Sequence, residues 1–164
     1  MRPRTLLLSF CVCAIPFTTA AAASMQQKLF VAGTRSSEIY VIDVATHRHV
    51  QTIRTDGNPH GFAATRDGKT LWASIGFLTP GKTAVARIDA ATGRILETHA
   101  VPGVDDLELV NEDRHLYIPG FGTGCYFVFD TQEKRIVARI ETAGLPHNVV
   151  APANVLYGDR KSVV

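Results

Sequence analysis

A unit of about 40 residues recurs along the chain, and this repetition constrains the fold more than any other feature of the sequence. Three segments align without a gap: IYVIDVATHRHVQTI from Ile39, VARIDAATGRILETH from Val85 and YFVFDTQEKRIVARI from Tyr126. In each segment an apolar strand ends at an aspartate, and a polar turn and a second strand follow. A glycine comes 14 residues after the aspartate in all three units, giving the pairs Asp43 and Gly57, Asp89 and Gly103, and Asp130 and Gly144.

A leucine followed by an aromatic residue marks the same position in four successive units. These leucines are 42, 45 and 40 residues apart, at Leu29, Leu71, Leu116 and Leu156. A period of this length, with four short strands per unit and little helical periodicity, is typical of a β-propeller blade. We therefore expect an all-β fold, a β-propeller of four-stranded antiparallel blades. The strand count predicts three strands of one blade, two whole blades and the start of a fourth, so about three blades are present.

The second unit allows its four strands to be placed. We expect them at residues 60–65, 71–75, 84–89 and 95–101, with an Asp-Gly hairpin between the first two. Strands such as YVI at 40–42 are apolar on both faces, which predicts blades that pack face to face, with Trp72 in their core. The connection 76–83 is longer than its counterparts, and its Pro-Gly pair favours a plain surface turn over a binding loop.

The N-terminal stretch MRPRTLLLSFCVCAIPFTTAAAAS has the composition of a secretory signal. Arg2 and Arg4 precede an apolar run that is too short to span a bilayer, and small residues follow this run. We expect residues 1–23 to be a signal peptide cleaved near Ala22 or Ala23, with an N-terminal membrane anchor as the alternative. Cleavage predicts a periplasmic or secreted protein without an integral membrane segment.

The C-terminal residues DRKSVV continue no strand or turn pattern of the repeat and match the translation of a common sequencing adapter. The first blade also lacks its innermost strand, which in a complete propeller would come from the C-terminal end of the chain. We therefore expect residues 24–158 to be part of a propeller, an N-terminal fragment of a longer ring. Residues 159–164 are expected to be a non-native tail.

Charge and cysteine content argue against several classes of function. Removing Arg2 and Arg4 with the signal leaves 15 of the 17 lysine and arginine residues against 15 acidic residues, so the remaining chain is neutral. A neutral chain lacks the basic surface typical of nucleic-acid binding. Cys125 is then the one cysteine left, and we expect it in the apolar core. Motifs for covalent haem, thiol redox chemistry or a serine nucleophile are absent from the sequence, so no cofactor is evident and no catalytic residue is assigned.

Two stretches carry a family resemblance: LFVAGTRSSEIYVIDVATHRHVQTI from Leu29 and GNPHGFAATRDGKTLWAS from Gly57. They resemble the YVTN-type β-propeller repeat proteins, and the YncE-like members in particular. The resemblance implies a periplasmic or secreted propeller, most often seven-bladed, whose ligands approach the central channel. Similar propellers include lactonase-type hydrolases and haem-d1-bearing nitrite reductase domains, and YncE-like proteins have been linked to DNA binding. The fold alone does not choose among these functions.

The turn GNPH at residues 57–60 has the counterparts GVDD and GLPH at the same place in the next two units. Each turn begins the innermost strand of a blade, and these strands line the channel of a propeller. The equivalent last residues, which are expected to ring one mouth of the channel, are His60, Asp106 and His147. Two imidazoles and a carboxylate suit a ligand, a divalent metal or proton transfer. The alternative is structural: the glycine of each turn supplies conformational freedom, and polar residues at a wet mouth need no further role.

These observations predict a binding or scaffold module that takes a partner protein or a small ligand at its channel face, without enzymatic activity. The alternative is a lactonase-like or metal-dependent hydrolase that uses the same histidine and aspartate residues. The repeated strand-end aspartates are expected to be structural, each accepting hydrogen bonds from the backbone of the following turn. Nucleic acid is not expected as a partner, because the mature chain is neutral.

Overall fold

The computed structural model describes residues 27–79, 81–142 and 144–151 of the chain. The expected signal peptide at 1–23 and the expected tail at 159–164 lie outside the described residues, as does Leu156. Every regular element in the described ranges is a β-strand. Within these ranges there is no helix with the length and hydrophobicity needed to cross a bilayer.

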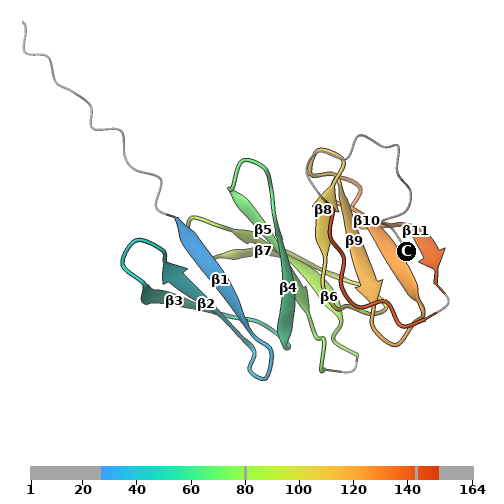
Figure 1. The fold of residues 1–164 in the computed structure, drawn as a ribbon, viewed down its shortest axis with the longest axis horizontal. Helices are drawn as coiled ribbons and strands as arrows, with labels where there is room; N and C mark the ends of the chain where they lie inside the picture. Colours follow the sequence, from blue (N-terminus) through green and yellow to red (C-terminus); the bar gives the residue numbers. More distant parts are fainter. Residues whose placement is uncertain (1–26, 80, 143, 152–164) are drawn as a thin grey trace, which may run out of the picture.

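The strands form three antiparallel sheets that follow one another in chain order and lie side by side (Figure 1). Blade 1 consists of β1 (Lys28–Gly33), β2 (Glu38–Asp43) and β3 (Arg48–Arg54). Blade 2 consists of β4 (Pro59–Ala64), β5 (Thr70–Ile75), β6 (Ala84–Asp89) and β7 (Ile95–Ala100). Blade 3 consists of β8 (Glu108–Val110), β9 (His115–Gly120), β10 (Cys125–Asp130) and β11 (Arg135–Glu141). The predicted series of a three-stranded blade followed by two four-stranded blades is confirmed.

The strands of blade 2 lie within one residue of the bounds that the repeat predicts. The innermost strand of blade 3 differs, because β8 begins at Glu108 rather than near Asp106 and has only 3 residues. Its hairpin turn places Asn111, Glu112 and Asp113 at φ of 54°, 54° and 67°. The β8–β9 ladder continues up to this turn, with Val110 opposite His115, so the strand is short because its first residues do not pair with β9.

Blade 2 is buried on both faces because its strands alternate between two apolar clusters. On the side that faces blade 1, side chains of blade 2 pack against Ile39 and Val41 of β2. The blade 2 residues in this cluster are Leu71, Ala73, Ile75, Ala84, Ala86 and Ile88. Toward blade 3, Trp72 and Val85 join Leu116, Ile118 and Phe129. Trp72 is 2 % exposed and Cys125 is 0 % exposed, so both predicted core positions are confirmed. Face-to-face packing explains why these strands are apolar at successive positions.

A β-bulge occurs at the same repeat position in all three blades. The register between the last two strands shifts at Val41/Ile42, Arg87/Ile88 and Val128/Phe129, just before the strand-end aspartate. A bulge bends and twists its strand locally. The outer strand of every blade is therefore bent at the same position and stays paired on both sides of the bend.

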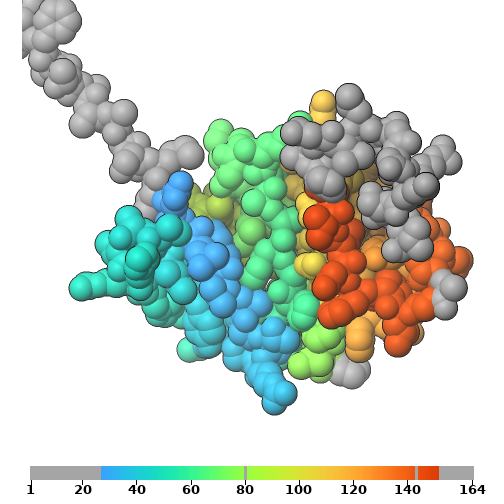
Figure 2. Space-filling view, in the orientation of Figure 1, coloured from blue at the N-terminus to red at the C-terminus, as the bar shows by residue number. Residues whose placement is uncertain are grey.

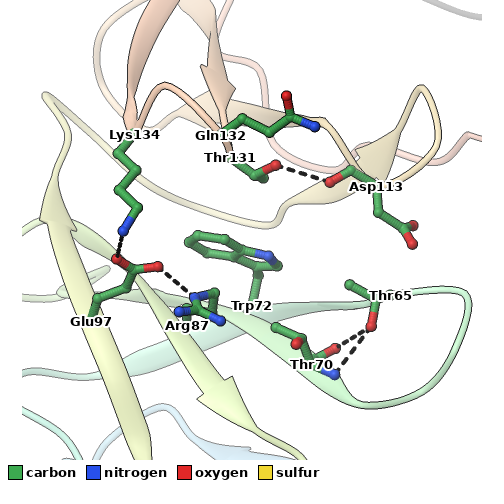
Figure 3. Close-up of a pocket in the computed structure, with 9 residues that line it drawn as sticks. All are labelled: Thr65, Thr70, Trp72, Arg87, Glu97, Asp113, Thr131, Gln132 and Lys134. Carbon is green, nitrogen blue, oxygen red and sulfur yellow. Dashed lines mark hydrogen bonds and ion pairs between the residues drawn. The ribbon is translucent and has the colours of Figure 1, made fainter.

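A charged cluster joins blade 2 to blade 3 (Figure 3). The Glu97 carboxylate on β7 accepts from Arg87 Nε of its own blade at 2.5 Å and from Lys134 Nζ of the next blade at 2.5 Å. The hydrogen bond from Lys134, helped by Arg87, lowers the pKa of Glu97 to about 2. Gln51 holds the equivalent place on β3 and donates to the Thr92 carbonyl of the next blade at 2.8 Å. Neighbouring blades are thus joined at this repeat position twice.

Replacing Glu97 with glutamine tests the joint between blades 2 and 3. Glu97→Gln should lower the free energy of unfolding by about 1 kcal/mol at neutral pH, since both cationic partners are partly exposed. The folded-state pKa lies below the ordinary value, so the stabilisation is complete above pH 4.5 and is lost as pH falls toward about 2.

Urea unfolding of the full chain as a function of pH measures this difference. Glu141→Gln is the matched control, because Glu141 is exposed and its ion pair, with Arg139, lies within its own strand. Equal midpoints for Glu97→Gln and the wild-type chain above pH 5 would show that the cluster contributes nothing to stability.

Candidate functional site

The chain crosses from the outer strand of one blade to the inner strand of the next at one end of the sheets. Because neighbouring strands are antiparallel, the loops from the second to the third strand of each blade lie at the same end. We call this the crossing end. In blades 2 and 3 its described residues are the crossings with the first residues of the strands that follow them, 55–61, 101–108, 142 and 144–147, and the loops 76–79, 81–83 and 121–124. In Figure 2 the last crossing, drawn in red, lies against the green surface of blade 2. All three predicted site residues belong to this end.

A buried serine joins two of the crossings. The Ser74 hydroxyl accepts a hydrogen bond from the Gly61 backbone N–H at 2.8 Å and donates one to the Asp105 carbonyl at 2.5 Å. This contact coincides with the register shift between β4 and β5 that lies between Pro59 and Phe62. The backbone of Asp105 is therefore fixed relative to the start of β4, where His60 lies.

Asp105 occupies the position that proline holds in the other two crossings. Pro59 and Pro146 are buried, and the aspartate at the same place is 0 % exposed. An ionised carboxylate loses its hydration when buried, so it needs partners that proline does not. The third crossing thus carries a residue that the turn itself does not require, which is a departure typical of functional positions.

Two histidines from the neighbouring crossings flank this carboxylate. The His147 imidazole meets Asp105 Oδ2 through Nδ1, and His60 Nδ1 lies 3.3 Å from Asp105 Oδ1. The two imidazole ring centroids are 6.2 Å apart. His60 Nδ1 and Asp105 Oδ1 are buried but not aligned to hydrogen-bond with each other or with any other described residue. The site therefore holds a buried anion between two imidazoles, with acceptor capacity left over.

Aromatic side chains from the loops of blades 2 and 3 border the histidines. The Phe77 ring lies against His60 with centroids 4.2 Å apart, and Phe121 lies 4.9 Å from Phe77. Phe121 is 50 % exposed. Phe121 directly follows β9, and Phe77 comes two residues after the end of β5, so the two rings meet from positions of the repeat that differ by one residue. The loop at 76–83, expected as a plain surface turn, supplies part of this border.

The structure brings His60 and His147 together, but the carboxylate between them belongs to Asp105 rather than to Asp106. Asp106 lies against β4, where a Cβ added to Gly61 would be 2.6 Å from the Asp106 Cα. Aligning the three turns groups the last residue of each, which is His60, Asp106 or His147. The contact instead joins the last residue of two turns to the third residue of the turn between them, Asp105. The signal that was present in the sequence is the exchange of proline for aspartate within GVDD.

The strand-end aspartates accept hydrogen bonds from the turns that follow them. Asp43 Oδ1 accepts from Thr46 N at 2.7 Å, Asp89 Oδ1 from Thr92 N at 2.7 Å, and Asp130 Oδ1 from Gln132 N at 2.8 Å. Hydrogen bonds from the turn backbone, with Arg114 adding to them, lower the pKa of Asp130 to about 2. This geometry gives the three carboxylates a structural role in closing their turns.

The three crossing glycines differ in what they provide. Gly57 has a φ of 148°, which disfavours other residues, whereas Gly103 is not among the glycines with a positive φ. At Gly103 the constraint is space, because an added Cβ would lie 3.0 Å from Thr123 Cγ2. At Gly144 an added Cβ would meet nothing within 4 Å. A positive φ thus distinguishes Gly57 from Gly103, and the general role expected of the three glycines stays a prediction.

A hollow with a volume of about 300 Å³ lies between blades 2 and 3, away from the crossing end. The side chains around it include Trp72, Arg87, Glu97 and Lys134 (Figure 3). Its charged groups pair with one another across the blades, as described above. Among residues 27–79, 81–142 and 144–151, no group of three or more histidine, cysteine, aspartate or glutamate side chains is placed to hold a metal ion.

Comparison with known proteins identifies the fold. No protein-family model and no curated protein matches the chain. Among solved structures, the Kuenenia stuttgartiensis hydrazine synthase matches with a TM-score of 0.62 and 18 % identity over 71 % of this chain and 33 % of that one. Apo AztD from Citrobacter koseri matches with a TM-score of 0.59 and 14 % identity, over 76 % and 34 % of the two chains.

The Dos1 propeller matches with a TM-score of 0.59 and 14 % identity, covering 73 % of this chain and 32 % of that one. The chain spans about a third of the length of each of these structures. The radial series of antiparallel sheets, together with these matches, shows that the chain folds as blades of a β-propeller.

Exchanging proline and aspartate between two crossings tests whether Asp105 stabilises the crossing or belongs to the candidate site without stabilising the fold. Asp105→Pro should leave the free energy of unfolding unchanged or raise it by up to about 1 kcal/mol, since proline fixes the backbone and no carboxylate is desolvated. The reverse change, Pro59→Asp, should lower the free energy of unfolding by at least about 2 kcal/mol. The new aspartate would be a buried charge without the pair of flanking histidines that Asp105 has.

Urea unfolding measures both variants, and ¹⁵N NMR of the imidazoles supplies a second readout. In the wild-type chain His147 should carry its proton on Nδ1, held there by the carboxylate, and in Asp105→Pro this preference should disappear. Asp105 would instead be a structural residue of the crossing if Asp105→Pro destabilised the chain as much as Pro59→Asp does.

Proposed function

We propose that this chain is part of an exported, YVTN-type β-propeller protein that binds a partner protein or a small ligand at its crossing end. The repeat sequence and the fold support the family, and the N-terminal composition supports export. In this proposal the protein is periplasmic or secreted, and binding rather than catalysis is its role. The site consists of His60, Asp105 and His147 with the Phe77 and Phe121 border.

The observation that carries the proposal is the buried carboxylate of Asp105. Two other crossings of the same chain use proline at this place, so the fold does not need the charge. Its two histidine neighbours come from different crossings, one before it and one after it in the chain. Charge that burial makes costly and packing does not require is typical of binding and catalytic sites.

A fragment screen by ¹H–¹⁵N NMR on the full chain tests the binding role. Fragments that bind should shift the backbone amides of His60, Phe77, Phe121 and His147 more than those around the hollow near Glu97, because the exposed aromatic rings and free acceptor groups lie at the crossing end. Asp105→Pro is the control that retains the fold and should lose at least about tenfold in affinity for these fragments. Fragments that shift the two regions equally would contradict the proposal.

A second candidate, a lactonase-like hydrolase, is favoured by the contact between Asp105 and His147. A carboxylate that holds Nδ1–H of an exposed imidazole leaves Nε2 free to act as a base. His147 Nε2 would take a proton from water as the water oxygen bonds to an ester carbonyl carbon. The proton would then pass to the leaving alkoxide as the carbon–oxygen bond breaks.

Hydrolysis of p-nitrophenyl acetate by the full chain tests this candidate. If His147 is the base, His147→Gln should lower the rate constant by at least about 100-fold. His49→Gln is the matched control, because that exposed imidazole contacts Thr52 and the Gln51 carbonyl away from the site. Equal rates in the two variants would remove the hydrolase candidate and leave the binding role untouched.

A further inference from the structure

One end of the blade series has an open strand edge beside an apolar face. In the described part of the chain β1 pairs with β2 alone, whereas β5 and β9, at the same place in blades 2 and 3, each pair on both sides. Leu29 of β1 is 51 % exposed. At the same repeat position, Leu71 and Leu116 are 5 % and 0 % exposed, because each packs against the preceding blade. Blade 1 therefore presents a strand edge and a face that another blade would bury.

The other end of the series carries a segment that has the sequence of an innermost strand but no partner strand. Residues 144–151 follow β11 and occupy the repeat position of β4 and β8. No backbone–backbone hydrogen bond joins them to another described residue. Side chains of blade 3 hold the segment in place: the Tyr126 hydroxyl donates to the Asn148 carbonyl at 3.1 Å, and the Glu108 carboxylate accepts from the Ala151 backbone. The segment is thus positioned as the first strand of a next blade.

Apolar side chains of this segment are exposed where their counterparts in the repeat are buried. Leu145 and Val150 are 71 % and 73 % exposed. Val104 holds the position of Leu145 one unit earlier, and Ala63 holds the position of Val150 two units earlier. Both counterparts belong to the buried core between blades 2 and 3. This end is therefore the second half of the same blade-to-blade contact.

The two ends are complementary in strand order and in register. Blade 2 pairs Phe62 with Ala73 and Ala64 with Leu71 between its first two strands. The same repeat positions in residues 144–151 and in β1 are Val149 with Val31 and Ala151 with Leu29. Within one copy the two ends do not meet, because blade 2 lies between them (Figure 1). A contact between them is therefore heterologous and joins two molecules.

We infer that two copies of this chain associate head to tail, with residues 144–151 of one copy completing blade 1 of the other. Pairing gives ladder partners to both strands and removes the apolar side chains of both ends from water. Because the blades are already arranged around one axis, two such contacts close a ring. Three blades from each copy give six, within the range of about four to eight that propellers have.

This association goes beyond the proposed binding role and does not depend on it. The second copy takes the place that further blades have in a longer propeller. It also adds to the crossing end, because its loop 34–37 would lie beside His147 as the loop that begins at Gly76 lies beside His60.

Sedimentation velocity of the full chain over a wide range of concentration tests the association. The mass should rise from that of one chain to that of two. Leu29→Lys and Val150→Lys, on opposite ends, should each weaken the association at least about tenfold, because each places a charge in the contact. Leu78→Lys is the matched control and should change nothing. Leu78 is as exposed as Leu29, but it lies on blade 2, which already has a neighbour on each side.

Disulfide cross-linking tests the register. Residues directly opposite each other in an antiparallel pair have Cα atoms about 4.5 to 5.5 Å apart, a separation that a disulfide spans. Oxidation should cross-link a mixture of Val31→Cys and Val149→Cys chains, but neither variant alone, and Cys125 is buried. In the control mixture Val150→Cys replaces Val149→Cys, and cross-linking should fall at least about tenfold, because the next residue of a strand points to the other face.

The inference is overturned if the chain is monomeric at every concentration or if Leu29→Lys leaves the association unchanged. It is also overturned if each cysteine variant cross-links alone as readily as the mixture does. The fragment screen decides the binding role separately, because it follows amides at the crossing end rather than the mass of the protein.

Discussion

The packing of blade 2 on both of its faces is the interaction on which the rest of the molecule depends. Leu71 and Ala73 face blade 1 while Trp72, between them, faces blade 3, so consecutive residues of β5 build two separate cores. Each core holds a neighbouring sheet at a fixed orientation. Because apolar side chains fill most of each blade face, the imidazoles and the carboxylate of the candidate site lie at the ends of the sheets. The position of the candidate site follows from this division.

Within that division, the crossings are held by backbone contacts and are free to vary in side chain. Ser74 ties Gly61 to the carbonyl of Asp105, and this contact requires no particular side chain at position 105. Proline suffices in two crossings, and aspartate is accommodated in the third between two histidines. A repeat fold can therefore place a charge in a buried position of one unit without altering the cores on either side. The binding proposal depends on that independence.

The sequence was sufficient to predict the repeat, the strand bounds of blade 2 and the three described strands of blade 1, because the period and the two-faced apolar pattern are properties of the chain itself. The sequence also predicted the two histidines of the candidate site, because they occupy the same position of the repeat. It did not predict the role of Asp105, because the approach of one crossing to the next is offset by one residue. That offset arises from tertiary contacts, such as the close passage of Asp106 over Gly61, which alignment of units does not contain. The aromatic border was missed for the same reason.

The bulge repeated in every blade affects how readily the exposed outer strands pair with strands of another molecule. Each outer strand is bent at that point, and β3 and β11 carry exposed arginines along their length, among them Arg48, Arg54, Arg135 and Arg139. Bent, charged edges are poor templates for pairing with strands of another molecule. The outer rim of a partly formed ring is thereby protected against edge-to-edge aggregation, although its apolar end faces are still uncovered.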